Sequence, residues 1–189
     1  MKILPIRTKS KNYNIYIGQN IISKINKIVI NENIKFKKTL IVVDKKIPKN
    51  FLKKILSKIV CDKKIIFLFN ASEKNKNLKS ANAILELLLK NNFTRNDIVI
   101  CLGGGITGDV TGFVASIYKR GLKFINIPST LLSQVDSSIG GKTGVNNKYG
   151  KNLIGSFYQP DLVISDITLL KSSPRREIIC GYAEIFKHS

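Results

Sequence analysis

One glycine-rich turn constrains the fold of this chain more than any other stretch. The run 97–102, which is mostly apolar and β-branched, leads directly into three glycines at 103–105, and apolar residues then follow at helical spacing. This pattern predicts a strand, a tight turn and a helix. Gly103, Gly105 and Gly108 also match G-x-G-x-x-G in that context, so we expect the turn to hold a phosphate at the helix N-terminus. The alternative is a tight connection that needs glycine only for its geometry.

The rest of the chain alternates between strand and helix patterns. Strands are expected at 3–8, 13–17, 38–44, 64–69, 97–102 and 124–128, and helices at 20–29, 49–59, 78–90 and about 108–119. This alternation predicts an α/β fold with a Rossmann-like, mostly parallel sheet flanked by helices. Asp44 ends an expected strand, where ligands bind in open parallel sheets. An ordinary dinucleotide fold has its acidic residue about 20 positions after the glycines, so we expect a variant arrangement.

A second glycine-punctuated stretch, residues 129–160, is rich in polar side chains. Lys142 lies in the run Gly-Gly-Lys-Thr-Gly (140–144), and Lys151 follows another glycine. Long polar segments inside a compact domain are usually functional loops, and lysines among free N–H groups favour phosphate. We therefore expect a second glycine loop that binds phosphate, with an incidental surface loop as the alternative. The spacing of its first glycine does not match a P-loop.

Composition narrows the classes of partner. The 189 residues include 32 Lys and Arg against 12 Asp and Glu, a net charge of +20 that would suit a nucleic-acid-binding module. The lysines are spread along the whole chain, however, and no basic block is interleaved with aromatic residues, so nucleic acid is not expected as a partner. No run of about 18 apolar residues and no signal-peptide pattern occurs, which argues against a membrane partner. Cys61, Cys101 and Cys180 are odd in number and far apart, which predicts reduced thiols and a cytoplasmic location.

Four segments of the chain match long motifs of one known family. They are Gly103–Asp109, Ile127–Asn146, Gly150–Pro160 and Pro174–Lys187. Together they resemble 3-dehydroquinate synthase, and the resemblance runs from about Tyr13 to the last residue. It implies a lyase of the shikimate pathway that converts 3-deoxy-D-arabino-heptulosonate 7-phosphate to 3-dehydroquinate and phosphate. It also implies NAD and a divalent metal, zinc or cobalt, as cofactors, a small sugar phosphate as partner and a homodimer at full length.

The resemblance also assigns site residues position by position. The positions that match NAD contacts are Asp44, Ser72, Glu73, Lys76, Gly104, Gly105, Ile106, Thr107, Gly108, Asp109, Ser129, Thr130, Lys142, Lys151, Leu169, Leu170, Lys171 and Ser172. The positions that match contacts to the substrate and its phosphate, here termed catalytic, are Arg120, Asp136, Lys142, Asn152 and Lys187. Arginine and lysine suit a phosphate dianion. Ser72 stands where the family usually has glycine, and Glu184 matches the metal-binding carboxylate.

Two of these residues have plain structural alternatives. A lone helical glutamate such as Glu184 more often faces solvent than binds a metal. Arg120, followed by Gly121, would also suit the C-terminal end of a helix. His188 lies four residues after Glu184 and could share its helix face. Because the family's metal histidines come from much later in its sequence, we do not expect His188 to be a ligand.

The resemblance predicts two domains, of which this chain holds one. Residues 1–172 are expected to form the NAD-binding α/β domain, and 173–189 the first segment of a helical domain that this chain lacks. A catalytic zinc site needs three protein ligands, so we expect a fragment that is inactive alone. Three alternatives stay open: another NAD-dependent sugar-phosphate cyclase, such as a 2-deoxy-scyllo-inosose synthase, a basic nucleic-acid-binding module, and a non-catalytic fragment that still folds.

Overall fold

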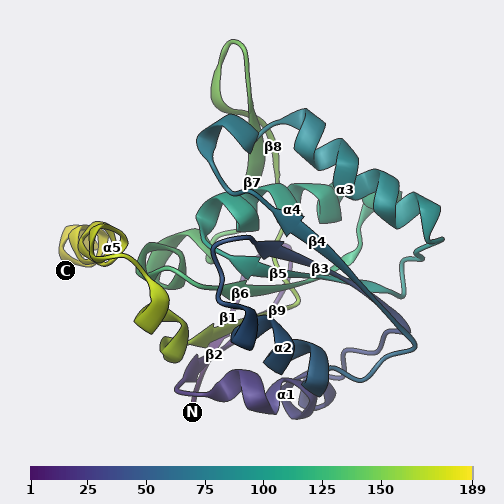
Figure 1. Cartoon of the computed structure of the whole chain (residues 1–189), viewed down its shortest axis with the longest axis horizontal. Helices are drawn as coiled ribbons and strands as arrows, with labels where there is room; N and C mark the ends of the chain where they lie inside the picture. Colours follow the sequence, from purple (N-terminus) through teal and green to yellow (C-terminus); the bar gives the residue numbers. More distant parts are fainter. Residues whose placement is uncertain (189) are drawn as a thin grey trace.

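A seven-stranded sheet runs through the computed structural model, which describes residues 1–188 (Figure 1). The strand order is β1-β2-β9-β6-β5-β3-β4. The strands are β1 (Lys2–Ile6), β2 (Tyr13–Gly18), β3 (Lys38–Asp44), β4 (Lys63–Phe69), β5 (Ile98–Gly103), β6 (Lys123–Pro128) and β9 (Leu162–Asp166). The β1–β2 pair is antiparallel, and the other described pairs of this sheet are parallel. The expected Rossmann-like, mostly parallel α/β fold is confirmed.

Helices cover both faces of the sheet, as Figure 1 shows. They are η1 (Ile21–Lys24), α1 (Ile25–Asn31), α2 (Lys49–Lys58), η2 (Glu73–Asn75), α3 (Leu78–Lys90), α4 (Gly105–Ile117), η3 (Tyr118–Arg120), the π-helical η4 (Ser133–Ser137), η5 (Ile167–Ser172) and α5 (Arg175–His188). Side chains alternate along β3, so Ile41 packs with α1 and α2 while Val42 packs with α3 and α4. Within residues 1–188, none of the helices combines the length and apolar character that crossing a bilayer requires.

Two sequence-based expectations were wrong in detail. Helix α4 begins at Gly105, rather than near 108, because Gly104 is extended (φ −77°, ψ −172°) and takes the N-cap position. The expected second glycine loop contains a two-stranded antiparallel hairpin, β7 (Lys142–Asn147) and β8 (Gly150–Phe157). Its polar, glycine-rich strands carry no alternating apolar pattern, because the hairpin packs on α3 and α4 rather than inside the sheet.

The parallel strands all end at the same edge of the sheet. In the β-ladder, Asp44 at the end of β3 pairs with Phe69 of β4, and Gly103 at the end of β5 pairs with Pro128 of β6. The connections that follow these ends therefore meet in one place. In open α/β sheets this edge is where ligands bind.

The opposite edge of the sheet is held by a buried carboxylate. Asp97, 2% exposed, accepts hydrogen bonds from the Lys38 N–H (2.9 Å), the Thr94 N–H (2.7 Å) and the Thr94 hydroxyl (3.0 Å). Burial alone would raise the pKa of Asp97, but these hydrogen bonds and the nearby Lys38 charge lower it below its usual value. Asp97 thereby joins the start of β5 to the start of β3.

We expect Asp97→Ala to lower the free energy of unfolding by about 2–4 kcal/mol, because three part-buried hydrogen bonds to the buried carboxylate are lost. Urea unfolding measures this loss. Because the pKa of Asp97 is lower in the folded protein than in the unfolded chain, its ionised carboxylate stabilises the fold fully above the unfolded-state pKa. This stabilisation is lost as the pH falls through the folded-state pKa of Asp97. The difference between the two proteins should therefore shrink in acid. Asp62→Ala, at an exposed carboxylate, is the control; equal losses in both variants would contradict this role.

Candidate functional site

A first cavity of about 380 Å³ lies at the carboxyl edge of the sheet. Of the expected NAD residues, those that line it are Asp44, Glu73, Lys76, Gly104, Gly105, Ile106, Asp109, Ser129, Thr130 and Ser172. These residues come from the segments after β3, β4, β5, β6 and β9, which the ladder register brings together. The structure thus places most of the expected nucleotide residues around one space.

The N-terminus of α4 faces the first cavity without a cap. Gly104 offers no side chain to the free N–H groups of the first turn, and this turn contains no acidic residue. A Cβ atom built on Gly105 would lie 2.9 Å from Ser137 Oγ, and one on Gly103 would lie 2.6 Å from Thr107 Cβ. Glycine is therefore needed for the close packing here. Free N–H groups and the positive end of the helix dipole make this turn suited to an anion.

Asp44 stands at the end of β3 on the same cavity. Its Oδ1 accepts a hydrogen bond from the Lys46 N–H at 3.0 Å. Burial raises the pKa of Asp44, and the nearby Glu177 carboxylate raises it further against the opposing effect of Lys46. An ionised carboxylate at this position accepts hydrogen bonds from hydroxyl groups such as those of a ribose.

The sequence analysis missed two charged residues of the first cavity, Lys46 and Glu177. Glu177 lies in the first turn of α5, which reaches the cavity from the far end of the chain. Lys46 comes only two residues after Asp44, the last residue of its strand. This closeness in sequence to a strand end could have identified Lys46 as a site residue. No comparable signal marks Glu177, because its position depends on how α5 packs.

Helix α5 packs closely against the residues that lead into η4, and a glycine makes this contact possible. A Cβ atom on Gly181 would lie 2.5 Å from Leu131 Cβ, so only glycine allows this approach. Glu184, one turn later, accepts a hydrogen bond from Lys187 Nζ at 2.9 Å. This bond raises the pKa of Lys187, and the Asp136 carboxylate adds to the shift, so α5 brings Lys187 within electrostatic reach of Asp136.

A second cavity of about 620 Å³ borders the first. Asp109 lines both spaces, and Asp136, Lys142 and Asn152 line the second. The structure therefore brings three of the five expected catalytic residues together around one space, beside the nucleotide residues. The lining combines a cation, carboxylates and an amide, which are groups that bind a polar, anionic small molecule.

The other two expected catalytic residues are not in the lining of either cavity. Arg120 ends η3, beyond the C-terminus of α4, and is exposed. Since the 13 residues of α4 span about 20 Å, Arg120 lies beyond the end of α4 that is farther from the glycine turn. Lys187 lies on α5 and is bonded to Glu184.

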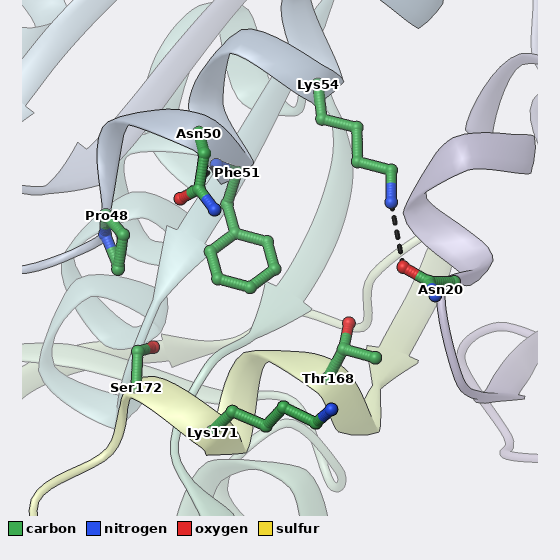
Figure 2. A pocket seen from close by; sticks show the side chains of 8 residues that line it. All are labelled: Asn20, Pro48, Asn50, Phe51, Lys54, Thr168, Lys171 and Ser172. Carbon is green, nitrogen blue, oxygen red and sulfur yellow. Dashed lines mark hydrogen bonds between the residues drawn. The ribbon is translucent and has the colours of Figure 1, made fainter.

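The residues expected after β9 are divided between the core and a third cavity. Lys171 and Ser172 line this cavity, of about 520 Å³, together with Phe51 of α2 and Lys54, whose ammonium donates to Asn20 Oδ1 at 2.8 Å (Figure 2). Ser172 also lines the first cavity, so the two spaces adjoin. Leu169 is fully buried in the core, and its side chain lines neither cavity; Leu170 is likewise absent from both linings.

The remaining expected nucleotide residues do not line the first cavity but lie in the segments around it. Thr107 is fully buried under the glycine turn, and Gly108 donates its N–H to the Gly104 carbonyl at 3.0 Å within α4. Ser72 Oγ caps η2 by accepting from the Asn75 N–H at 3.3 Å. Lys151 of β8 is an exposed strand residue, so both lysines of the expected second glycine loop belong to the hairpin.

The residues that the structure describes do not complete a metal site. Within them, no group of three or more His, Cys, Asp or Glu side chains is close enough to hold an ion. Glu184 contributes one carboxylate, whereas a catalytic zinc site takes three protein ligands. The side chain of His188 lies outside the described residues. Glu184 alone therefore does not fit a complete metal centre.

Comparisons with known proteins identify a matching family. The family described as 3-dehydroquinate synthase N-terminal matches residues 66–180. The 3-dehydroquinate synthase of Pelagibacter ubique (strain HTCC1062) is 62% identical over 98% of this chain, and that of Campylobacter concisus (strain 13826) is 48% identical over 97%. The chain spans about half the length of these curated relatives, 50% of each.

A solved structure shares the fold. A 2-deoxy-scyllo-inosose synthase complexed with carbaglucose-6-phosphate, NAD⁺ and Co²⁺ matches with a TM-score of 0.89 and 25% identity. The match covers 98% of this chain and 50% of that one.

Proposed function

Because the chain belongs to the 3-dehydroquinate synthase N-terminal family, we propose that it supplies the nucleotide-binding half of a 3-dehydroquinate synthase and binds NAD. One observation carries the proposal: the uncapped N-terminus of α4 and the strand-end carboxylate of Asp44 face the same cavity. This pair supplies what a dinucleotide requires, an anion site for its pyrophosphate and an acceptor for its ribose hydroxyls.

The residues present fit the pyrophosphate and the adenosine ribose of NAD. The N–H groups of Gly105 and Ile106 would hold the pyrophosphate, and Asp44 the adenosine ribose. The adjoining third cavity, with Lys171 and Ser172, extends the space on one side (Figure 2). When bound, NAD supplies the hydride chemistry that oxidises and reduces a substrate alcohol. Hydride transfer requires contact between nicotinamide and substrate, so the nicotinamide end belongs at the border of the two cavities.

The second cavity is proposed to hold the sugar phosphate of the whole enzyme, 3-deoxy-D-arabino-heptulosonate 7-phosphate. Lys142 supplies a cation and Asn152 an amide for its oxygens, and Asp136 an acceptor for its hydroxyls. Elimination of phosphate and ring closure would yield 3-dehydroquinate. The relative with a bound phosphate sugar analogue also holds Co²⁺. For this chain we propose Glu184 as one metal ligand and assign no step to the metal.

Calorimetric titration of the chain with NAD tests this proposal. We expect saturable binding of NAD and weaker binding of NADP, because a 2′-phosphate would meet the carboxylates of Asp44 and Glu177. Equal affinities would contradict the role of Asp44, and absence of binding would contradict the proposed function.

A second candidate is a cyclase that acts on another sugar phosphate, which the match to 2-deoxy-scyllo-inosose synthase favours. The identities of 62% and 48% to 3-dehydroquinate synthases, against 25% to this structure, support the first candidate. Presenting glucose 6-phosphate and 3-deoxy-D-arabino-heptulosonate 7-phosphate in turn to the enzyme that contains this sequence distinguishes them. We also propose a cytoplasmic location, which the three unpaired cysteines support.

The affinity for NAD is expected to fall in mild acid. Burial raises the pKa of Asp44, so its carboxylate is protonated at a higher pH than an ordinary aspartate. The neutral acid accepts ribose hydroxyls less well, so binding weakens as pH falls through this raised pKa. Titrations at a series of pH values, from neutral downward through the acid range in which the chain stays folded, measure the change. Asp44→Asn removes the titrating group and should flatten the profile; an unchanged slope in that variant would assign the pH dependence to another group.

A further inference from the structure

A buried lysine connects the two cavities. Lys76 is 5% exposed, and its Nζ lies 2.5 Å from Asp109 Oδ2 and 2.5 Å from Asn152 Oδ1. Lys76 lines the first cavity, Asn152 lines the second, and Asp109 lines both. A single ammonium group thus joins the segment after η2, helix α4 and strand β8 at the border between the cavities.

This contact decides which end of the Asn152 amide is available to a ligand. An ammonium group can only donate, so Asn152 must offer its oxygen to Lys76. The backbone of Asn152 is left-handed (φ +58°), and its N–H donates to Asn146 Oδ1 at 3.0 Å. The side-chain oxygen and the backbone N–H of Asn152 are therefore both hydrogen-bonded. Asn152 presents its remaining side-chain group, the amide NH₂, to the second cavity as a hydrogen-bond donor.

The hairpin around Asn152 is bonded to the segment that carries Lys76. The Asn146 N–H donates to the Lys76 carbonyl at 2.7 Å, and Asn146 Nδ2 donates to Glu73 Oε2 at 2.9 Å. Lys151 forms a wider ion pair with Glu73, at 3.5 Å. Movement of the 73–76 segment is therefore transmitted to both strands of the hairpin.

We propose that Lys76 is a positioning residue that couples the two cavities: nucleotide in the first cavity fixes Lys76, which fixes hairpin β7–β8 and presents the Asn152 NH₂ group to the second. A buried ammonium that lost either partner would be poorly compensated, so it keeps both. The first cavity is lined by Glu73 and Lys76 from the segment around η2 and by Asp109 from α4, so its occupation restrains these two segments. The Lys76–Asn152 hydrogen bond extends the restraint to β8. The nucleotide thereby prepares a donor for an oxygen-rich ligand before that ligand arrives. The inference rests on the proposed function, because the nucleotide is NAD.

Amide hydrogen exchange of the 189-residue chain tests this coupling, with and without saturating NAD. In the absence of NAD, Lys76→Met should speed exchange across residues 150–157 by at least about threefold. In the unaltered chain NAD should slow exchange there, and in Lys76→Met it should not. Asn152→Gly removes the acceptor, tolerates the left-handed backbone and leaves the buried Lys76–Asp109 pair in place. It should behave like Lys76→Met, so it serves if the lysine variant does not fold.

Two matched variants make the test specific. Asn152→Asp keeps an acceptor for the ammonium and should retain the protected hairpin, whereas Lys74→Met removes an exposed lysine from the same segment and should change nothing. Equal exchange in Lys76→Met and the unaltered chain without NAD would overturn the inference, whatever the nucleotide does. Calorimetry separates the remaining outcomes: NAD bound without any change in the hairpin overturns the coupling alone, and no binding of NAD overturns the proposed function with it.

Discussion

Gly104→Asp is expected to weaken NAD binding at least 100-fold, about 2.7 kcal/mol, while leaving the fold as stable as before. Gly104 occupies the N-cap of α4 in an extended conformation that aspartate adopts readily. Aspartate is a preferred N-cap residue, so its carboxylate would satisfy the free N–H groups of the first turn. The same carboxylate would then occupy the place of the pyrophosphate and repel it. Calorimetric titration with NAD and urea unfolding measure the two effects.

Gly104→Asn is the matched control, because asparagine has the same shape and also caps helices but carries no charge. A Cβ atom at this position would lie 3.1 Å from Thr130 Cγ2, so both variants need the same small adjustment. We expect the asparagine variant to bind NAD better than the aspartate variant. Unchanged affinity in both variants would show that NAD does not use this helix terminus.

A polypeptide of these 189 residues is expected to bind NAD and yet show no synthase turnover, with or without added Zn²⁺ or Co²⁺. Among the side chains that the structure describes, no group of three or more His, Cys, Asp or Glu is close enough to hold a catalytic metal. Arg120 also lies beyond the C-terminus of α4, a helix of about 20 Å that begins at the glycine turn. Release of phosphate from 3-deoxy-D-arabino-heptulosonate 7-phosphate, in the presence of NAD and metal, measures turnover.

The 3-dehydroquinate synthase of Pelagibacter ubique, assayed under the same conditions, is the control for this experiment, since it is 62% identical over the shared half. Phosphate release in proportion to the concentration of the 189-residue chain would contradict the expectation. It would mean that the described residues bind substrate and metal by an arrangement other than the one proposed.

The parts of the fold that follow from local pattern were predicted well. Strand β5, the glycine turn and α4 carry strong signals, because a buried parallel strand is continuously apolar and the turn needs glycine. The position of Asp44 at a strand end likewise followed from the sequence, since a β-branched run stops there. Local signals were weaker for the hairpin β7–β8. Its strands are polar and contain glycines, a pattern that is typical of a loop.

The parts that depend on long-range packing could not be predicted from the sequence. Nothing local indicates that Lys76 is buried between α4 and β8, because lysine is ordinarily exposed. The packing of α5 against Leu131 depends on Gly181. Gly181 lies within a helical sequence pattern, which does not indicate that another segment packs closely against it. Site roles of individual residues came from the family resemblance, and they stay predictions until binding is measured.

The central claim is that NAD binds with its pyrophosphate at the N-terminus of α4 and its ribose at Asp44. Two-dimensional NMR of the ¹⁵N-labelled chain, titrated with NAD, tests it most directly because it locates the ligand residue by residue. We predict that the largest amide shifts fall on residues 104–109 and around Asp44, with smaller shifts in hairpin β7–β8. Saturable shifts confined to surfaces away from the glycine turn, or no shifts at all, would contradict the claim.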